Sequence, residues 1–423
     1  KNKTKVRRSN TTKNIMKFRD YQEQIIAKGI DVIGEHGFVY LAMEVRTGKT
    51  LTSLGIAKEI GAKRVLFITK KKAISSIESD YEMLKPKFTL EVINYESLHK
   101  VEGSFDLVVL DEAHSMGAFP KPSKRAKQVR IIIQKNDPLV ILLSGTPTPE
   151  SYSQMYHQIY AIPGNPFKRF VNFYKFCAEH VNVTQRPING MYIRDYSNGL
   201  PSIMDSMQPF FIAYSQKEAG FKVQTNEHIL HVKMSPLTYN VAAKLQKNLV
   251  VEGKEEVILA DTPVKLMMKL HQIYSGTVKF ESGASKTLDL TKAKFIKERF
   301  KGKKIGIFYK FKEELKALQE VFQDTLTTQL KEFVNSKKSV ALQIVSGREG
   351  ISLKQAECLV YYNIDFSATS YWQSRDRMTT KDRTHNEVYW IFSEGGIEDQ
   401  IYKAVINKKD YTLNHFRKDL LNL

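Results

Sequence analysis

The sequence has few cysteines and no long hydrophobic run. Its two cysteines, Cys177 and Cys358, lie far apart in apolar surroundings. This usage argues against a disulfide scaffold, and no metal-ligand spacing is present. The longest apolar runs, such as Leu139 to Leu143, are far too short to span a bilayer. Since the polar, basic start also lacks the apolar core of a secretory signal, we expect a cytoplasmic protein.

Acidic residues are also scarce relative to basic ones. The chain has 65 Lys and Arg against 45 Asp and Glu, which gives a net charge of +20 over 423 residues. Residues 1–19 carry eight basic side chains and no acid, and residues 121–135 carry six and no acid. Hydrophobic content of 42% and charged content of 26% are ordinary for a globular protein. The excess predicts a polyanionic partner, with nucleic acid favoured over a membrane.

The stretch from Leu41 to Thr50, LAMEVRTGKT, places Gly-Lys-Thr directly after an apolar run. A phosphate-binding loop ends in this way. Backbone amides at the start of a helix hold the phosphates, Lys49 neutralises the β/γ oxygens and Thr50 can ligate magnesium. Met43 replaces the first glycine of the full G-x-x-x-x-G-K-T pattern. On its own, such a tripeptide is more often an ordinary turn.

A second stretch, Phe105 to His114, supports the nucleotide site. It predicts a buried strand over Asp106 to Leu110 that ends in Asp111 and Glu112. Ligands bind at the carboxyl ends of strands in open α/β sheets. We therefore expect Asp111 to hold magnesium and Glu112 to polarise the attacking water. Together the two stretches predict a nucleoside triphosphatase.

Apolar runs followed by amphipathic stretches recur along the chain. This repeated order predicts an α/β fold with parallel sheets and helices on both faces. Dense aromatics over Phe167 to Phe176 indicate core packing rather than base stacking. The chain is expected to change domain near His228 to Pro236, where a strand-like run ends in Ser-Pro. Buried strands are predicted at 65–69, 91–95, 139–143, 304–309, 339–344, 358–362 and 388–392, and helices at 51–60, 313–322 and 397–408.

These motifs carry a family resemblance. FRDYQ, GKT, DEAH and SGTPT occur in the order and spacing of the first motor domain of superfamily 2 helicases. INYESL before DEAH, and SGREGISL at 346–353, resemble the Swi/Snf-type DNA translocases in particular. The resemblance runs from about Phe18 to Phe416 and is closest to compact versions from bacteria and their phages. It implies a cytoplasmic location in a bacterial or phage-infected cell.

The resemblance also implies an architecture. We expect two RecA-like parallel-sheet domains with the nucleotide in the cleft between them, plus helical protrusions. The expected boundaries are a basic tail at 1–17, a first motor domain at 18–232 and a second at 233–423. The protrusions are expected within about 151–230 and about 237–290.

Site residues follow motif by motif from the same resemblance. Gln22 looks like an adenine-reading glutamine, because its amide both donates and accepts; a helix-surface glutamine is the alternative. Lys70, Lys71 and Lys72 would contact a nucleic-acid backbone, with a solvated turn as the alternative. Nucleotide binding is implied for Arg19, Gln22, Arg46, Thr47, Gly48, Lys49, Thr50 and Gly350, and nucleic-acid contact or coupling for Lys70, Lys71, Lys72, Ser144, Thr146, Ser346 and Gly347.

Residues 371–384, YWQSRDRMTTKDRT, resemble the sixth motif of the family, Q-x-x-D-R-x-H-R-I-G-Q. Gln373, Asp376 and Arg377 match the family's Gln, Asp and first Arg. The resemblance implies that Arg377 stabilises charge on the transferring phosphoryl group.

The sixth motif also departs from the family. Thr380 stands in place of the second arginine and Thr379 in place of the histidine. An arginine finger contributes roughly 10³ to 10⁵ in rate, so the sequence predicts nucleotide binding more directly than fast hydrolysis. Arg375 and Arg383 are candidates to replace the missing arginine. A further departure is Arg46, where the family usually has glycine.

The sequence thus predicts an ATP- and magnesium-dependent, monomeric translocase on duplex DNA that does not separate strands processively. The nearest alternative is a strand-separating helicase on DNA or RNA. Another is a slowly hydrolysing, nucleotide-gated DNA-binding switch, which the threonine in the sixth motif favours. A nucleotide-binding protein without a nucleic-acid partner conflicts with the charge of +20. A nuclease is disfavoured because no additional carboxylate–lysine cluster is evident.

Overall fold

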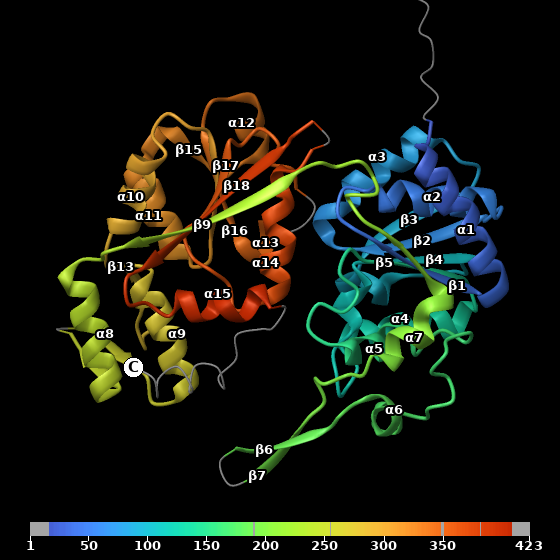
Figure 1. Ribbon diagram of the computed structural model, residues 1–423, viewed down its shortest axis with the longest axis horizontal. Coiled ribbons are helices and arrows are strands. Elements are labelled where there is room, and N and C mark those ends of the chain that lie inside the picture. The colour runs from blue at the N-terminus through green and yellow to red at the C-terminus, as the bar shows by residue number, and fades with distance from the viewer. Residues whose placement is uncertain (1–16, 189–190, 254, 348–350, 381, 408–423) are drawn as a thin grey trace, which may run out of the picture. The chain divides into compact units, whose positions relative to one another are not determined.

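The computed structural model describes residues 17–188, 191–253, 255–347, 351–380 and 382–407 (Figure 1). The chain divides into two compact units, Lys1–Thr148 with Tyr152–Ser215, and Pro149–Ser151 with Gln216–Leu423. Each unit is built on one six-stranded sheet. All strand pairs within these two sheets are parallel, which confirms the predicted α/β class with two parallel-sheet domains.

The first unit orders its strands β3-β2-β4-β5-β1-β8. In that order they are Thr89–Asn94, Arg64–Thr69, Leu107–Asp111, Leu139–Leu143, Phe38–Met43 and Phe211–Tyr214. The helices are α1 (Asp20–His36), α2 (Lys49–Glu59), α3 (Ile74–Leu84), α4 (Lys124–Asn136), α5 (Met155–Ile159), α6 (Phe173–His180) and α7 (Ser202–Met207). Short 3₁₀ turns are η1 (Lys71–Ala73), η2 (Tyr95–Lys100), η3 (Ala113–Met116), η4 (Tyr152–Gln154) and η5 (Gln208–Phe210). A separate hairpin pairs β6 (Thr184–Ile188) with β7 (Met191–Asp195).

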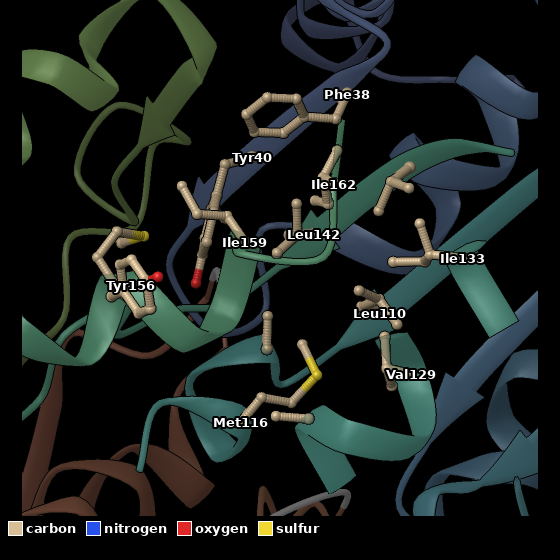
Figure 2. Close-up of a cluster of buried hydrophobic side chains, with 14 of the residues drawn as sticks. Phe38, Tyr40, Leu110, Met116, Val129, Ile133, Leu142, Tyr156, Ile159 and Ile162 are labelled. Carbon is tan, nitrogen blue, oxygen red and sulfur yellow. The ribbon is translucent and has the colours of Figure 1, made fainter. Parts of the chain in front are cut away.

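Both faces of this sheet are buried. Alternate residues of β1, β4 and β5 enter one hydrophobic cluster with α4 and α5, and the intervening residues enter another with α1, α2 and α3. Figure 2 shows the first cluster, in which Tyr40 and Leu142 lie near Ile159. Burial on both faces explains why the strands appear in the sequence as continuous apolar runs.

The aromatic segment between residues 167 and 176 belongs to the same core. Phe167, Phe170, Phe173 and Phe176 are all buried in the cluster that covers the α4 and α5 face. Their rings contact one another at centroid distances of 5.0 Å for Phe167–Phe176 and 5.8 Å for Phe173–Phe176. The prediction of core packing rather than base stacking is therefore confirmed.

The second unit orders its strands β15-β16-β14-β17-β18-β9. In that order they are Leu326–Thr327, Ser339–Gln343, Ile305–Tyr309, Cys358–Tyr361, His385–Ser393 and Gln224–Val232. The helices are α8 (Pro236–Asn248), α9 (Pro263–Tyr274), α10 (Thr291–Arg299), α11 (Lys312–Phe322), α12 (Leu330–Asn335), α13 (Ile344–Gly347), α14 (Ala368–Ser374) and α15 (Glu398–Ile406). The 3₁₀ turns are η6 (Gln323–Thr325) and η7 (Arg375–Met378), and two hairpins join β10 (Val250–Glu252) to β11 (Val257–Leu259) and β12 (Thr277–Lys279) to β13 (Ser285–Thr287).

The domain change falls earlier than the sequence suggested. The chain enters the second unit after Ser215 rather than near residue 232. The reason is that β9 pairs along its whole length with β18 as the edge strand of the second sheet. The strand-like run that seemed to end the first domain therefore begins the second. The expected protrusion segments contain short helices together with the β6–β7, β10–β11 and β12–β13 hairpins.

Among the helices in the described part of the chain, none has the length and apolar character needed to cross a membrane.

A buried ion pair joins helices α10 and α15. Lys292 Nζ lies 2.8 Å from Glu398 Oε1, and both side chains are fully buried. The same ammonium lies 3.4 Å from the carbonyl oxygen of Tyr362, at the end of β17. Removing one partner of such a pair leaves a buried charge without its counter-charge.

We expect Glu398→Gln to lower the free energy of unfolding by about 3–5 kcal/mol, because the Lys292 ammonium would lose its counter-charge. Urea denaturation of the full chain measures this change. Exposed Glu394 supplies the control, and Glu394→Gln should stay within about 0.5 kcal/mol of the wild type. Equal stability of the two variants would contradict the assignment.

Candidate nucleotide site

The strand register of the first sheet brings three sequence motifs to one edge. Strand β5 lies between β4 and β1, and Leu143 pairs with both Leu41 and Asp111. Because the strands are parallel, the segments that follow them emerge at the same edge. The Gly-Lys-Thr loop, the Asp-Glu pair and the Ser-Gly-Thr segment therefore meet there.

The loop after β1 turns sharply into helix α2. Gly48, the residue before the helix, has φ 85° and ψ 33°, and Arg46 has φ 65°. Thr47 is fully buried, and its hydroxyl donates to the carbonyl oxygen of Glu44 at 2.7 Å. The loop thus ends at Lys49, the first residue of α2, where the backbone amides have no partner within the helix. This is the backbone arrangement that binds phosphate.

A side chain at position 48 would also displace Gln22. A Cβ there would lie 2.5 Å from Nε2 of Gln22. Gln22 is 4% exposed, and its Nε2 donates to the carbonyl oxygen of Gly48 at 3.4 Å. Its Oε1 accepts from the backbone amide of Arg19 at 3.0 Å. The Gln22 amide therefore braces the loop through Nε2 and caps the start of α1 through Oε1, and adenine recognition by Gln22 stays a prediction.

Tyr21 is a second brace that the sequence did not reveal. Its hydroxyl donates to the carbonyl oxygen of Thr47 at 2.9 Å, and Nη1 of Arg19 donates to that hydroxyl at 3.1 Å. The Tyr21 ring stacks on Tyr214 of β8 at a centroid distance of 4.7 Å. Arg19 thus reaches the loop through Tyr21.

The acidic pair at the end of β4 lies in a buried environment. Asp111 Oδ2 accepts from the Thr69 hydroxyl at 2.7 Å, and the Tyr95 hydroxyl donates to the Asp111 carbonyl oxygen at 2.7 Å. Burial raises the pKa of Asp111 to about 6, and the Glu112 charge adds to that rise. A carboxylate that is costly to ionise without a cation is well suited to receive one. Thr69 and Tyr95 were not predicted, because β2 and η2 bring them to the end of β4 only in the folded sheet.

Two residues at this site have strained backbone. Six described non-glycine residues have positive φ, and four of them directly follow helices α3, α4, α8 and α11. The other two are Arg46 in the loop and Glu112, which has φ 50°. Left-handed backbone in non-glycine residues costs about 1–3 kcal/mol and clusters at functional sites. Arg46 therefore has backbone strain that a glycine would avoid.

Lys49 lies beside the segment that follows β5. A Cβ on Gly145 would lie 3.6 Å from Lys49 Nζ, and 3.4 Å from both the Met43 carbonyl oxygen and the Val45 amide nitrogen. Gly145 therefore allows the two loops to approach closely. The positive charges of Lys49 and Lys70 both oppose the rise in the Asp111 pKa, which places them on the same edge.

A polar chain connects the acidic pair to the Ser-Gly-Thr segment. His114 Nδ1 lies 2.9 Å from Ser144 Oγ and 3.3 Å from Glu112 Oε2. Ser144 Oγ also accepts from the backbone amide of Thr146 at 3.1 Å. The sequence analysis named Ser144 and Thr146 as coupling residues but overlooked His114, although it is the last residue of DEAH. A displacement of Glu112 would reach the Ser-Gly-Thr segment through this histidine.

The three lysines after β2 divide into two environments. Lys70 acts electrostatically on Asp111, whereas Lys71 and Lys72 are exposed in η1. The basic residues between 121 and 135 lie largely on α4, which begins after Ser123, whose hydroxyl accepts from the amide of Ala126 at 3.1 Å. Nucleic-acid contact by these lysines stays a prediction.

The remaining predicted residues lie in the second unit. Gln373 in α14 and Arg377 in η7 are 5% and 8% exposed, and the Arg377 carbonyl oxygen accepts from the Leu353 amide at 2.8 Å. Ser346 and Gly347 end α13. Gly350 lies outside the described residues.

The two candidate replacements for the missing arginine have partners in the second unit. Arg375 Nη1 lies 2.9 Å from Glu227 Oε1. The Arg383 guanidinium donates to the carbonyl oxygens of His385, Ala356 and Glu357 at 3.0, 2.8 and 2.9 Å. Arg383 thereby connects the two residues that precede β17 to the first residue of β18.

The side chains at this edge fit a nucleoside triphosphate with magnesium. The start of α2 offers backbone amides, Lys49 offers a cation, and the elevated pKa of Asp111 marks a carboxylate that a cation would stabilise. Thr50 occupies the second position of α2, beside Lys49.

No protein-family model and no curated protein sequence matches the chain. Among solved structures, the chain is similar to the Sulfolobus solfataricus SWI2/SNF2 ATPase core in complex with dsDNA. The identity is 15%, the match covers 93% of this chain and 91% of that one, and the TM-score is 0.42. It is also similar to the Sulfolobus solfataricus SWI2/SNF2 ATPase core domain, with 16% identity, 93% and 89% coverage and a TM-score of 0.42.

We expect Gly48→Ala to lower nucleotide affinity about tenfold or more, because the added Cβ would push Gln22 away and strain the loop. Gly61→Ala is the matched control. Gly61 also has positive φ, 70°, but its Cβ would meet no atom within 4 Å. Titration with a fluorescent ATP analogue measures both variants, and equal affinities would contradict the steric role of Gly48.

The fold should gain stability at pH 8 when Asp111 is replaced by asparagine. A folded-state pKa near 6, above the usual value, means that the ionised carboxylate costs stability above that pH. The gain from Asp111→Asn should shrink as the pH falls through 6. Thermal unfolding from pH 8 to pH 4 measures it.

Asp106→Asn is the control of opposite sign. Backbone amides of Arg64 and Lys63 donate to Asp106 and hold its pKa below the usual value. Asp106→Asn should therefore lose stability at pH 8, with the loss disappearing in acid. If Asp111→Asn also lost stability at pH 8, the burial assigned to Asp111 would be wrong.

Proposed function

We propose that this protein is an ATPase whose hydrolysis is stimulated by nucleic acid and that it translocates on duplex DNA. The observation that carries the proposal is the convergence of Lys49, Asp111 and Glu112 at one edge of a parallel sheet. A phosphate loop or an acidic pair alone would be a weaker indication. Their alignment through β5 forms a phosphate-binding loop and a cation site side by side.

The roles follow from the chemistry of each group. The amides at the start of α2 and Lys49 bind the phosphates, while Thr50 and Asp111 hold magnesium. When bound, the ion supplies positive charge against the β and γ phosphates. Glu112 orients water for attack, and its contact with His114 links it to Ser144. Any change at Glu112 therefore reaches the Ser-Gly-Thr segment, as coupling to a second ligand requires.

The choice of nucleic acid as that second ligand rests on charge and on the motif resemblance. A net charge of +20 favours a polyanion, and the motifs resemble translocases that act on duplex DNA. The motif resemblance assigns to Arg377 the stabilisation of charge on the transferring phosphoryl group. Movement without processive strand separation and action as a monomer belong to the same proposal.

Steady-state ATP hydrolysis tests this proposal directly. The full chain is assayed without nucleic acid and with duplex DNA, single-stranded DNA or RNA, with Lys49→Ala as the control for contaminating activity. Strong stimulation by duplex DNA alone is the expected result. Stimulation mainly by single strands or by RNA would favour a strand-separating helicase.

A second candidate is a nucleotide-gated DNA-binding switch that hydrolyses ATP slowly. The contacts of Arg375 and Arg383 favour it, because both arginines hold their own unit together. Thr379 is likewise used internally, since its hydroxyl accepts from Asn386 Nδ2 at 2.8 Å. On this account the second catalytic arginine is missing.

If the missing arginine limits turnover, Thr380→Arg should raise the turnover number about tenfold or more with little change in nucleotide affinity. Thr380→Lys is the control, because it restores positive charge without the planar guanidinium. Unchanged turnover in Thr380→Arg would show that position 380 does not limit hydrolysis.

A further inference from the structure

Glu227 on strand β9 lies at the centre of an aromatic cluster in the second unit. Its carboxylate accepts from the Tyr371 hydroxyl at 2.7 and 2.9 Å, from Trp390 Nε1 at 2.9 Å and from the Tyr402 hydroxyl at 3.1 Å. Arg375 Nη1 lies 2.9 Å from the same group. The donors come from α14, β18, α15 and η7, so one carboxylate ties four elements together.

Burial of the Glu227 carboxylate costs free energy, which its hydrogen-bond donors and counter-charge must offset. The Glu227 and Arg375 side chains are 14% and 20% exposed. A carboxylate that is largely withdrawn from water requires a full set of donors and a counter-charge. Glu227 has both, whereas an apolar side chain would have filled the same space without them. Unlike an apolar side chain, the carboxylate holds particular segments together through their donors.

The aromatic rings make the cluster rigid. Tyr371 and Trp390 stack at 5.4 Å between ring centroids, and Trp390 and Tyr402 lie 5.6 Å apart. Burial raises the pKa of Tyr402 to about 12, with the Glu227 charge adding to the rise. Tyr402 therefore remains a neutral donor to the carboxylate at physiological pH. The Arg375 guanidinium lies 4.8 Å from the centroid of the Trp372 ring.

Glu227 also occupies a special position along the chain. Strand β9 begins at Gln224, eight residues after the chain enters the second unit at Gln216. Its carboxylate contacts Tyr371 and Arg375, which lie on either side of Gln373 and just before Arg377 in the sixth motif. Strand β9 and the arginine-bearing segment are therefore joined through one side chain.

We propose that Glu227 is a positioning residue for the sixth motif: by holding Arg375 and Tyr371 it fixes the segment that carries Arg377. The inference rests on the proposed ATPase function. Glu227 itself would not touch the nucleotide.

The two tryptophans of the chain, Trp372 and Trp390, both lie in this cluster, so intrinsic fluorescence reports on it directly. The test compares wild type with Glu227→Gln, which keeps the side-chain size but removes the charge. Glu387→Gln is the matched control. Glu387 lies on the neighbouring strand β18 and accepts from Asn226 and His228 of β9, and its described hydrogen bonds include no residue of the sixth motif.

Glu227→Gln should change the tryptophan emission and lower the DNA-stimulated kcat about tenfold or more, with the KM for ATP within about twofold of wild type. Glu387→Gln should leave emission, kcat and KM near wild-type values. Because Glu227 acts through Arg375, the double variant Glu227→Gln/Arg375→Gln should lose no more kcat than the larger single loss. Tyr402→Phe removes one donor and should give a smaller loss of the same kind.

A wild-type kcat in Glu227→Gln, despite an altered emission spectrum, would overturn the proposal and leave Glu227 a structural residue only. Additive losses in the double variant would also overturn it. Should Glu227→Gln fail to fold, Tyr402→Phe and Arg375→Gln decide by the same kcat and KM comparison. Failure of the proposed ATPase function is distinguishable, because wild type would then hydrolyse no more ATP than Lys49→Ala.

Discussion

The parallel register of β4, β5 and β1 is the constraint on which the rest of the first unit depends. Leu143 pairs with Leu41 on one side and with Asp111 on the other, so the three following segments leave the sheet at the same level. A shift of one residue in either pairing would send alternate side chains to the opposite face. The buried clusters on both faces oppose such a shift, because they contain alternate residues of all three strands. Core packing thereby sets the geometry of the site.

That edge combines features that are each unfavourable for folding alone. Glu112 and Arg46 have left-handed backbone, and Asp111 is a carboxylate whose pKa is raised by burial. The surrounding contacts from Thr69, Tyr95 and Tyr21 hold these features in place. A bound cation would lower the free-energy cost of the buried Asp111 charge. Binding of a cation and polyphosphate would therefore stabilise this part of the fold. The second unit shows the same principle at Glu227, where a cage of donors stabilises a withdrawn charge.

Local patterns predicted the buried strands and the main helices closely. The strand predicted at residues 65–69 is Arg64–Thr69, and the helix predicted at 51–60 is Lys49–Glu59. Such elements can be predicted because a continuous apolar run or a terminal glycine is a feature of neighbouring residues in the sequence. Long-range relationships were less accessible. The edge pairing of β9 with β18 joins residues 161 positions apart in sequence, such as Glu227 and Val388, and it places the domain boundary before β9.

The site residues likewise divide into those that local motifs predict and those that depend on long-range contacts. Lys49, Asp111 and Glu112 were identifiable because motif spacing places them at strand ends, and the structure brings them to one edge. Thr69, Tyr95 and His114 contribute through contacts with Asp111 or Ser144 that only the folded sheet creates. Gln22 illustrates the limit of a motif, since its amide braces Gly48 and Arg19 in this structure.

Nucleotide binding as a function of magnesium tests the central claim most directly, since that claim is a phosphate and cation site at the edge of the first sheet. A fluorescent ATP analogue is titrated into the full chain with magnesium or with a chelator, for wild type and Asp111→Asn. The account predicts that magnesium strengthens binding to wild type and has little effect on Asp111→Asn. The same magnesium dependence in both proteins would contradict it, as would wild-type affinity in Lys49→Ala.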